Sequence, residues 1–353
     1  MSHLFCLSCA KQFPINQAIW RCDCGGLLDI EFKAEFTVEK TQKRKNNLWR
    51  YREAIPVEND QNIVSLDEGC TPIKKELLFG KEIWVKNDTL FPTKSYKDRG
   101  ATVLISKIKE LGITSVVEDS SGNAGCAVAC YCREAGIVCD IFVPEMTSEA
   151  KIKMIEKFGA RLHLITGSRE DTFKAAFVEA QNLYYASHSW NPFFFQGIKT
   201  CAYEIWEQLN WKSPDAIIVP VGNGTLLIGI FKGFQDLMLA KQIAKMPKII
   251  AVQAENCAPL IHPEIIIQPT LAEGIAIAEP VRREQILQIV SETGGYFVSV
   301  TEDEINQGVV DAENAGYLIE PTSGTVLAAL KKEVHTFDLK ENVVIVLTGY
   351  GTK

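Results

Sequence analysis

From about residue 82 onward, short apolar runs rich in β-branched residues alternate with amphipathic stretches. No other feature of the sequence constrains the fold as strongly. The expected strands cover residues 83–86, 115–118, 138–143, 162–165, 216–221, 249–253, 296–300 and 343–347. The expected helices between them cover residues 101–111, 124–135, 150–158, 226–239 and 281–293. This alternation predicts an α/β fold with one or two doubly wound, mostly parallel sheets.

Charge and composition exclude several classes of function. The chain has 353 residues, of which 46% are hydrophobic, and a formal net charge of -7. An acidic chain repels nucleic acid unless it carries a basic stripe, and the short run at 40–45 (KTQKRK) is more typical of solvated surface. No stretch reaches the ~18 apolar residues of a membrane span, and the start lacks a secretory signal. We therefore expect a cytoplasmic protein without nucleic-acid or membrane partners.

The N-terminal segment carries two closely spaced cysteine pairs, Cys6 with Cys9 and Cys22 with Cys24. Two such pairs on tight turns can bring four thiolates to one tetrahedral ion, and the two glycines that follow let the second turn bend. The alternative is a loop that holds only reduced thiols. We favour a zinc knuckle, and four protein ligands would make the zinc structural because no coordination position stays open.

Two glycine-rich turns directly follow expected strands. Residues 120–125 (SSGNAG) open a helix and offer backbone N–H groups to an anion such as a carboxylate. Residues 221–225 (VGNGT) add a hydroxyl and a helix dipole, which suit a phosphate. Each turn taken alone is also an ordinary connection between a strand and a helix.

A third segment, residues 93–100 (TKSYKDRG), lies at the start of an expected helix. Its second lysine, Lys97, follows a tyrosine and precedes Asp98 and Arg99. A lysine in this setting can serve as an imine-forming amine. Taken alone, however, the segment is more typical of a solvated helix N-terminus.

Taken in order, these segments resemble the pyridoxal-phosphate enzymes of the tryptophan synthase β-like class, and most closely the threonine synthase family. Residues 92–100 are similar to the family's P-T-x-S-[FY]-K-D-R-G, and residues 347–353 (LTGYGTK) to its C-terminal T-G-x-G. Residues 68–72 (EGCTP) are similar to its E-G-x-T-P. Some members, especially archaeal ones, also begin with a cysteine knuckle. The resemblance covers nearly the whole chain.

The resemblance implies the fold type II architecture of these enzymes, with two doubly wound, mostly parallel sheets. It implies a cysteine knuckle over residues 1–35 and a small α/β domain over residues 91–190. The large cofactor domain would combine residues 36–90 with residues 191–353. A homodimer is the oligomeric state that we expect.

The resemblance also assigns roles to single residues. Lys97 would hold pyridoxal phosphate as a Schiff base and then shuttle substrate protons. Ser121 would bind the substrate carboxylate, and Asn191 would also contact the substrate. The other cofactor contacts would be Asn123 at the ring hydroxyl, Gly222, Asn223, Gly224 and Thr225 at the phosphate, and Thr348 at the pyridine nitrogen. A hydroxyl at that nitrogen does not enforce a protonated ring, which favours elimination and replacement over transamination.

One segment departs from the family pattern. Residues 191–200 (NPFFFQGIKT) are similar to N-P-[YF]-R-x-x-G-Q-K-T, but Phe194 stands where the family has an arginine. That arginine is associated with the phosphate of the substrate, and phenylalanine offers no charge-assisted bond to a phosphate. The candidate cations that would replace it are Lys94, Arg99 and Lys199.

The activity implied is conversion of O-phosphohomoserine and water to L-threonine and phosphate by a carbon–oxygen lyase. Residues 270–277 (TLAEGIAI) look more like serine/threonine ammonia-lyases. The alternative is therefore such an ammonia-lyase, or a β-replacement enzyme acting on an O-activated serine. A third reading is a cofactor-binding protein without turnover, against which the presence of Lys97 with Asp98 and Arg99 argues. His188 lies close to Asn191 in sequence, and we expect it to be a packing or surface residue.

Overall fold

The computed structural model describes residues 2–351, which form two compact units. The first unit comprises residues 2–69 and 97–198, and the second comprises residues 70–96 and 199–351. Residues 36–69, which we expect in the large domain, lie in the first unit in this division, so the domain boundaries stay a prediction. The last two residues of the C-terminal TGYGTK segment lie outside the described residues.

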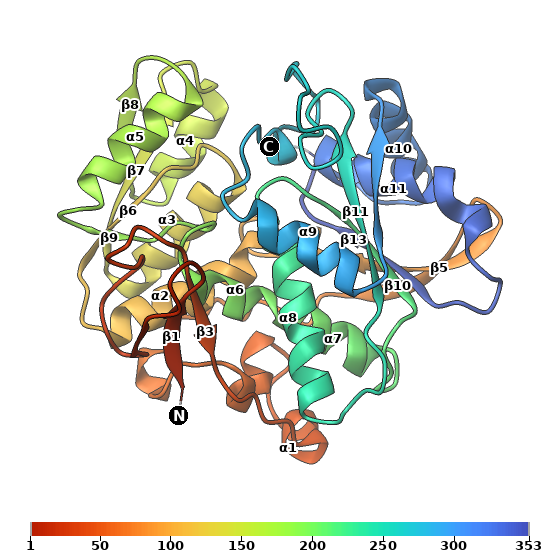
Figure 1. The fold of residues 1–353 in the computed structure, drawn as a ribbon, viewed down its shortest axis with the longest axis horizontal. Coiled ribbons are helices and arrows are strands. Elements are labelled where there is room, and N and C mark those ends of the chain that lie inside the picture. The colour runs from red at the N-terminus through yellow and green to blue at the C-terminus, as the bar shows by residue number, and fades with distance from the viewer. Residues whose placement is uncertain (1, 352–353) are drawn as a thin grey trace. The chain divides into compact units, whose positions relative to one another are not determined.

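The first unit contains a four-stranded sheet in the order β8–β7–β6–β9, and all its strands are parallel. The strands are β6 (Ser115–Glu118), β7 (Val138–Pro144), β8 (Arg161–Ile165) and β9 (Tyr184–Tyr185). The helices of this unit are α1 (Val38–Lys43), α2 (Lys97–Glu110), α3 (Asn123–Ala135), α4 (Glu149–Lys157), α5 (Arg169–Glu179) and α6 (Pro192–Ile198). Figure 1 shows α3, α4 and α5 beside these strands, whereas α1 lies away from them.

The N-terminal segment forms a small antiparallel sheet in the order β2–β1–β3. Its strands are β1 (His3–Cys6), β2 (Gln12–Pro14) and β3 (Leu28–Glu31). Trp20 attaches this segment to the rest of the unit, because its indole N–H donates to the carbonyl of Ala180 at 3.2 Å. Its ring also meets the rings of Tyr185 and Trp190 edge to face.

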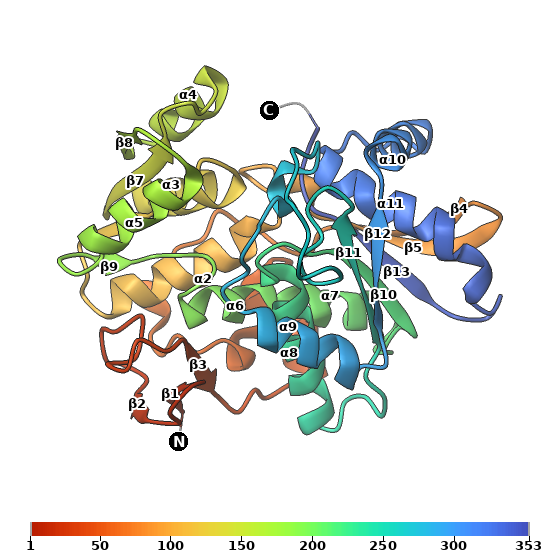
Figure 2. The ribbon, with the colours of Figure 1, turned by 45° about the horizontal axis from the view of Figure 1, so that its top comes forward.

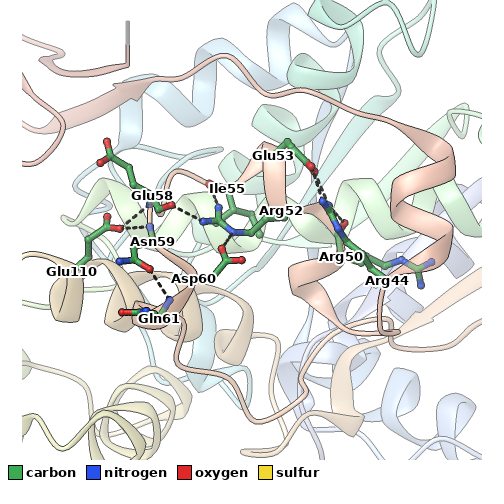
Figure 3. A network of polar contacts seen from close by, with 10 residues as sticks. All are labelled: Arg44, Arg50, Arg52, Glu53, Ile55, Glu58, Asn59, Asp60, Gln61 and Glu110. Carbon is green, nitrogen blue, oxygen red and sulfur yellow. Dashed lines mark hydrogen bonds and ion pairs between the residues drawn. The ribbon is translucent and has the colours of Figure 1, made fainter.

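Polar contacts hold the segment that follows β3 in place (Figure 3). Arg44 donates to both carboxylate oxygens of Glu53 at 2.6 Å, and this pairing lowers the pKa of Glu53 to about 2. The Glu110 carboxylate at the end of α2 accepts the backbone N–H groups of Glu58 and Asn59 at 2.8 and 2.9 Å. The segment is thereby anchored to the helix that begins at Lys97.

The second unit contains a six-stranded sheet in the order β12–β11–β10–β13–β5–β4. All of its strands are parallel except β4, which pairs antiparallel with β5. The strands are β4 (Ile73–Leu78), β5 (Lys81–Asn87), β10 (Ala216–Pro220), β11 (Lys248–Ala254), β12 (Tyr296–Val300) and β13 (Val343–Leu347). Strands β10 and β13 are continuous apolar runs that are buried along their whole length, as parallel strands covered on both faces require.

Helices cover both faces of this sheet. They are α7 (Thr200–Gln208), α8 (Thr225–Leu239), α9 (Arg283–Glu292), α10 (Glu302–Asn314) and α11 (Pro321–Glu333). Helices α8 and α9 lie on one side of the strands and α10 and α11 on the other, in both views (Figures 1 and 2). None of the helices in residues 2–351 combines the length and the apolar character that crossing a membrane would need.

The predicted fold class is confirmed, with parallel α/β sheets and a small cysteine-bearing segment at the N-terminus. Strands 115–118, 296–300 and 343–347 begin and end where the sequence predicts. The antiparallel strand β4 is absent from the prediction, because its sequence IKKELL has exposed charges and little apolar periodicity.

A buried ion pair joins three parts of the second unit. Lys86 of β5 donates to Glu204 of α7 at 2.6 Å, and neither side chain is exposed. Lys86 also donates to the carbonyl of Thr71 and to Gln208, and Glu204 accepts the backbone N–H of Cys70. These extra hydrogen bonds offset the cost of taking two charges out of water.

Glu204→Ala should therefore be strongly destabilising, because it leaves the Lys86 ammonium buried without its charged partner. We expect a loss of about 3–5 kcal/mol in the free energy of unfolding, measured by urea denaturation. The matched control is Glu82→Ala, which removes the exposed partner of Lys75 at 2.8 Å. That change should cost less than about 1 kcal/mol. Equal losses for the two variants would contradict the proposed importance of the buried pair.

Candidate functional site

Lys97 is the first residue of α2 and is half-buried. Its Nζ atom lies 5.9 Å from the centre of the Phe194 ring, which belongs to α6 and is fully buried. An aromatic face attracts an ammonium group only weakly compared with a carboxylate. Lys97 therefore lies against an apolar ring, and this ring belongs to Phe194, the residue that stands where the family pattern has an arginine.

Two glycines let α2 and α6 approach closely. A Cβ atom on Gly100 of α2 would lie 2.2 Å from the Phe194 ring. A Cβ atom on Gly197 of α6 would lie 1.8 Å from the carbonyl oxygen of Arg99. Both distances are far below contact distance, so neither position accepts a side chain without moving the helices apart. The pair of glycines fixes how Phe194 lies against the start of α2.

The turn after β6 has the predicted form. Ser120 accepts the backbone N–H of Gly122 at 3.3 Å, and Asn123 begins α3. Ser121 and Asn123 are both half-buried, so ligands can reach them. A Cβ atom on Gly125 would lie 1.9 Å from the carbonyl oxygen of Ser120, which explains the second glycine of the motif. The assigned roles of Ser121 and Asn123 stay predictions.

Two ionisable residues that the sequence does not single out as functional meet beside this turn. Glu118 ends β6 and is fully buried, and its Oε1 lies 2.7 Å from Nδ1 of His188. Burial raises the pKa of Glu118 to about 8 and lowers the pKa of His188 well below its usual value. His188 is thus buried and has a specific acidic partner. A glutamate that ends an apolar strand just before a glycine turn is a sequence signal for Glu118, whereas no local pattern points to His188, 70 residues further along the chain.

Asp119, the next residue, has its own partners. It accepts the phenol O–H of Tyr185 at 2.6 Å and pairs with the Arg169 guanidinium at 2.7 Å. Burial raises the pKa of Asp119 and the charge of Arg169 opposes this rise. Asp119 and Arg169 therefore neutralise each other, and this pairing holds the start of α5 against the end of β6.

In the second unit, residues 222–225 connect β10 to α8 and fit a phosphate group. The hydroxyl of Thr225 is buried and has no hydrogen-bond partner among residues 2–351. Gly224 has a φ of +76°, and a Cβ atom there would lie 2.5 Å from the Ile286 side chain. A Cβ atom on Gly222 would lie 2.9 Å from Ile275. The loop thus combines an unused buried hydroxyl, a bare backbone and a helix N-terminus, which together suit an anion.

Thr348 follows β13 directly and is almost fully buried. Its hydroxyl lies 2.8 Å from the hydroxyl of Ser323 and 3.2 Å from Glu320. Ser323 also accepts the backbone N–H of Thr348 at 2.8 Å. These contacts fix the orientation of the Thr348 hydroxyl, and its assignment to the pyridine nitrogen stays a prediction.

Asn191 is fully buried and caps the start of α6. Its side chain donates to the carbonyl of Tyr185 at 3.1 Å and accepts the backbone N–H of Phe193 at 3.2 Å. Both ends of the amide are therefore engaged within the fold. Its assignment as a substrate contact stays a prediction, but these bonds give it a structural role as well.

The three cations that were candidates to replace the family arginine have different surroundings. Lys199 is buried and pairs with Asp236 at 2.7 Å, so its charge is already neutralised. Arg99 is fully buried. Lys94 is exposed, and its Nζ lies 5.6 Å from the centre of the Tyr350 ring. Of the three, Lys94 is the cation that an incoming ligand can reach.

The four N-terminal cysteines come together as predicted. The ligand atoms of Cys6, Cys9, Cys22 and Cys24 all lie within 4.8 Å of one another, and three sulfur–sulfur distances are 3.5–3.6 Å. A zinc ion with bonds of ~2.3 Å to four sulfurs gives edges of ~3.8 Å. A Cβ atom on Gly26 would lie 2.7 Å from the Cys6 sulfur, so the cluster also needs this glycine. The residues fit a tetrahedral metal site.

Comparison with known proteins agrees with this geometry. The family described as "Pyridoxal-phosphate dependent enzyme" matches residues 64–349. A threonine synthase of Methanocaldococcus jannaschii is 36% identical, and the aligned region covers 99% of this chain and 92% of that protein. A threonine synthase of Methanosarcina acetivorans is 32% identical over 100% of this chain and 92% of that protein.

Solved structures show the same fold at lower identity. A pyridoxal 5'-phosphate-dependent aspartate racemase has a TM-score of 0.70 and 22% identity, covering 92% of this chain and 97% of its own. A serine racemase from Dictyostelium discoideum has a TM-score of 0.66 and 27% identity, covering 81% of this chain and 94% of its own. The chain therefore belongs to the pyridoxal-phosphate dependent enzymes and, within them, to the threonine synthase family.

Proposed function

We propose that the protein is a pyridoxal-phosphate dependent lyase that converts O-phosphohomoserine and water to L-threonine and phosphate. The observation that carries this proposal is the threonine synthase similarity over nearly the whole chain, and the buried, unpartnered Thr225 hydroxyl in a loop that suits a phosphate supports it. Lys97, the turn at 120–123, residues 222–225 and Thr348 would hold the cofactor and substrate.

Each of these residues has its own role in the proposed reaction. When bound, pyridoxal phosphate supplies an electron sink that acidifies the C–H bonds near the substrate amine. Lys97 takes the Cα proton and then one from Cβ through its ε-amine. The backbone N–H groups of the turn at 120–123 and the Ser121 hydroxyl orient the substrate carboxylate. Phosphate would leave from Cγ with its bonding electron pair, and the hydroxyl of a water molecule would add at Cβ. The two abstracted protons would return to Cγ and to Cα, which gives the methyl group and the Cα–H of threonine, and the proton of the water would leave with the phosphate.

We propose that Lys94 provides the positive charge for the substrate phosphate. Its exposure and the neutralised state of Lys199 support this assignment. A phosphate dianion without a cation nearby would lose much of its hydration without compensation. Phe194 would then form part of the wall of the site. Selection among substrates would depend on the shape of this wall and on the positive charge of Lys94.

The ammonia-lyase or β-replacement alternative is supported by residues 270–277. The threonine synthase relatives align over nearly the whole chain, whereas the 270–277 likeness concerns one loop. Product analysis with O-phosphohomoserine, threonine and O-phosphoserine separates the readings. Threonine and phosphate formed only from O-phosphohomoserine would support the proposal, and ammonia released from threonine would support the alternative.

Lys97→Ala should abolish turnover and the covalent attachment of the cofactor. We expect a yellow wild-type protein whose absorbance is bleached by borohydride, because the reduction fixes the cofactor covalently on Lys97. The variant should retain no fixed cofactor and lose activity at least about 100-fold. The control is Lys153→Ala, which removes an exposed lysine whose partner is Glu149 on the same helix. Wild-type protein that stays colourless with added cofactor would contradict the proposed function.

Phe194→Arg should lower kcat/KM for O-phosphohomoserine rather than raise it. The ring is fully buried against Gly100, so a guanidinium there would be desolvated and would repel Lys97. We expect a loss of about 10-fold or more, worth ~1.4 kcal/mol, in steady-state kinetics. Phe194→Leu, which keeps the wall apolar, serves as the control. A 10-fold gain for Phe194→Arg would show that the site lacks a cation for the phosphate.

We also propose that the cysteine cluster binds a structural zinc ion. The tetrahedral fit of the four sulfurs supports this, and so does the position of Trp20, which attaches the same segment to α5 and β9. A bound ion would rigidify the N-terminal segment and, through the contact of Trp20 with Tyr185, strand β9 of the four-stranded sheet. It would not take part in the reaction, because four protein ligands leave no open position.

Metal analysis by mass spectrometry should find about one zinc per chain in the purified protein. Cys6→Ser and Cys22→Ser should each lose this zinc, because the remaining three thiolates no longer complete the tetrahedron. Cys70→Ser, which changes a half-buried cysteine outside the cluster, should keep it. Unchanged zinc in the first two variants would overturn the assignment.

A homodimer in the cytoplasm, acting on a small amino-acid substrate, completes the proposal. The substrate class follows from the threonine synthase relatives. Light scattering on the purified protein tests the oligomeric state directly, and a mass of one chain would contradict the dimer.

A further inference from the structure

The Glu118–His188 pair has an unusual chemical state. Oε1 of Glu118 lies 2.7 Å from Nδ1 of His188, whereas Oε2 is buried and has no hydrogen-bond partner among residues 2–351. A charged carboxylate oxygen without a partner is costly in a protein interior, but the carbonyl oxygen of a neutral carboxylic acid is much less so. The geometry therefore fits a protonated Glu118 whose Oε1–H donates to the imidazole.

The electrostatics agree with this state. Burial raises the pKa of Glu118 to about 8, although the positive charges of Arg169 and Lys97 act in the opposite direction. Burial and the charge of Lys97 lower the pKa of His188 well below its usual value. At neutral pH Glu118 thus keeps its proton, His188 is a neutral imidazole, and the pair has no net charge. It becomes negative when that proton leaves for solvent in mildly alkaline solution.

The charged groups around the pair come from several elements. Arg169 of α5 is paired with Asp119, which also accepts from Tyr185 of β9, and a guanidinium keeps its proton in neutral and mildly alkaline solution alike. Lys97, the first residue of α2, has a positive charge that acts on both Glu118 and His188. Among these cations, Lys97 is the one whose protonation can respond to a change in the pair.

Phe194 lies close to both His188 and Lys97. Its ring centre lies 6.2 Å from that of His188 and 5.9 Å from Nζ of Lys97. A buried apolar ring next to both an imidazole and an amine excludes water from their surroundings, so the charge of Lys97 acts strongly on the pair and the charge of the pair acts strongly on Lys97. Ionisation of the pair should therefore influence the amine.

We propose that Glu118 and His188 are positioning residues that set the proton affinity of Lys97. The uncharged pair adds no negative charge beside the ε-amine, so the amine gives up its proton readily and can accept one from the substrate. After ionisation, the pair adds one negative charge and holds the proton on the amine. This inference rests on the proposed role of Lys97 and extends it to two residues outside the family motifs.

The first test follows pH dependence in the cofactor-loaded protein. The cofactor absorbance and kcat/KM of the wild type should both show a transition near pH 8, the pKa that burial gives Glu118. Glu118→Gln keeps the shape and a hydrogen bond to His188 but cannot ionise, so this transition should vanish from both profiles. Profiles that superimpose on those of the wild type would overturn the proposal.

The chain offers a matched control in another carboxylate–histidine pair of the same sheet. Asp140 of β7 lies 2.7 Å from Nε2 of His163 of β8. This pair is partly exposed, with 43% of the His163 side chain accessible, so water screens its charge. Asp140→Asn should retain the wild-type transition. Its loss in this variant as well would show that the transition is not specific to Glu118.

A second test needs no cofactor and separates failure of this inference from failure of the proposed function. The folded-state pKa of Glu118 lies above its unfolded value of 4.5, so its contribution to stability is present at low pH and is lost as pH rises through about 8. The melting temperature of Glu118→Gln, relative to wild type, should therefore rise between about pH 5 and about pH 9. A difference that does not change with pH would overturn the protonated state of Glu118, whether or not Lys97 binds cofactor.

A third measurement uses the unaltered chain. In protein labelled with nitrogen-15 at histidine, the His188 signal, identified by its loss in His188→Asn, should keep the shifts of a neutral imidazole well below pH 6.5. Titration of His188 at or above that value would overturn the assignment of the shared proton, even if Glu118→Gln failed to fold.

Discussion

Parallel pairing constrains this protein most strongly, because it brings the carboxyl ends of all the strands of a sheet to the same edge. Strands β10 and β13 are buried along their whole length and exclude polar side chains until they end. The polar groups therefore lie where the strands end, at residues 222–225 after β10 and at Thr348 after β13. The same holds in the other unit, where β6 ends at Glu118 and the turn at 120–123 follows. Each sheet thus collects its reactive groups at one edge.

The sequence predicts this layout well because apolar runs and glycine turns are local signals. Strand 115–118 and the turn after it follow directly from a few consecutive residues. The partners of Glu118 do not, since His188 lies 70 residues further along the chain and Phe194 belongs to a helix of three consecutive phenylalanines. Long-range pairs of this kind depend on how helices pack, and periodicity carries no information about that. The sequence also predicts the cysteine cluster, because its members are close along the chain.

The surroundings of Lys97 are less charged than the sequence suggests. Asp119 and Arg169 neutralise each other, and Phe194 replaces the family arginine by an apolar ring. In so apolar an interior, each remaining ionisable group has a large effect on its neighbours, because little water is present to screen it. A buried glutamate can then act as a switchable charge even though it makes no contact with solvent. The apolar wall and the acid–histidine pair are two aspects of the same low-dielectric environment.

The close approach of α2 and α6 has a consequence for how such a chain can diverge. Gly100 leaves room for the Phe194 ring, and Gly197 leaves room for the Arg99 carbonyl. An alanine at either position would push the two helices apart and displace the wall from the lysine. Changes at residues 100, 194 and 197 are therefore coupled. A lineage that altered one of them would have to alter the others to keep the side chain at position 194 in contact with Lys97. Three positions without any reactive group thus limit which substrates a descendant of this enzyme can acquire.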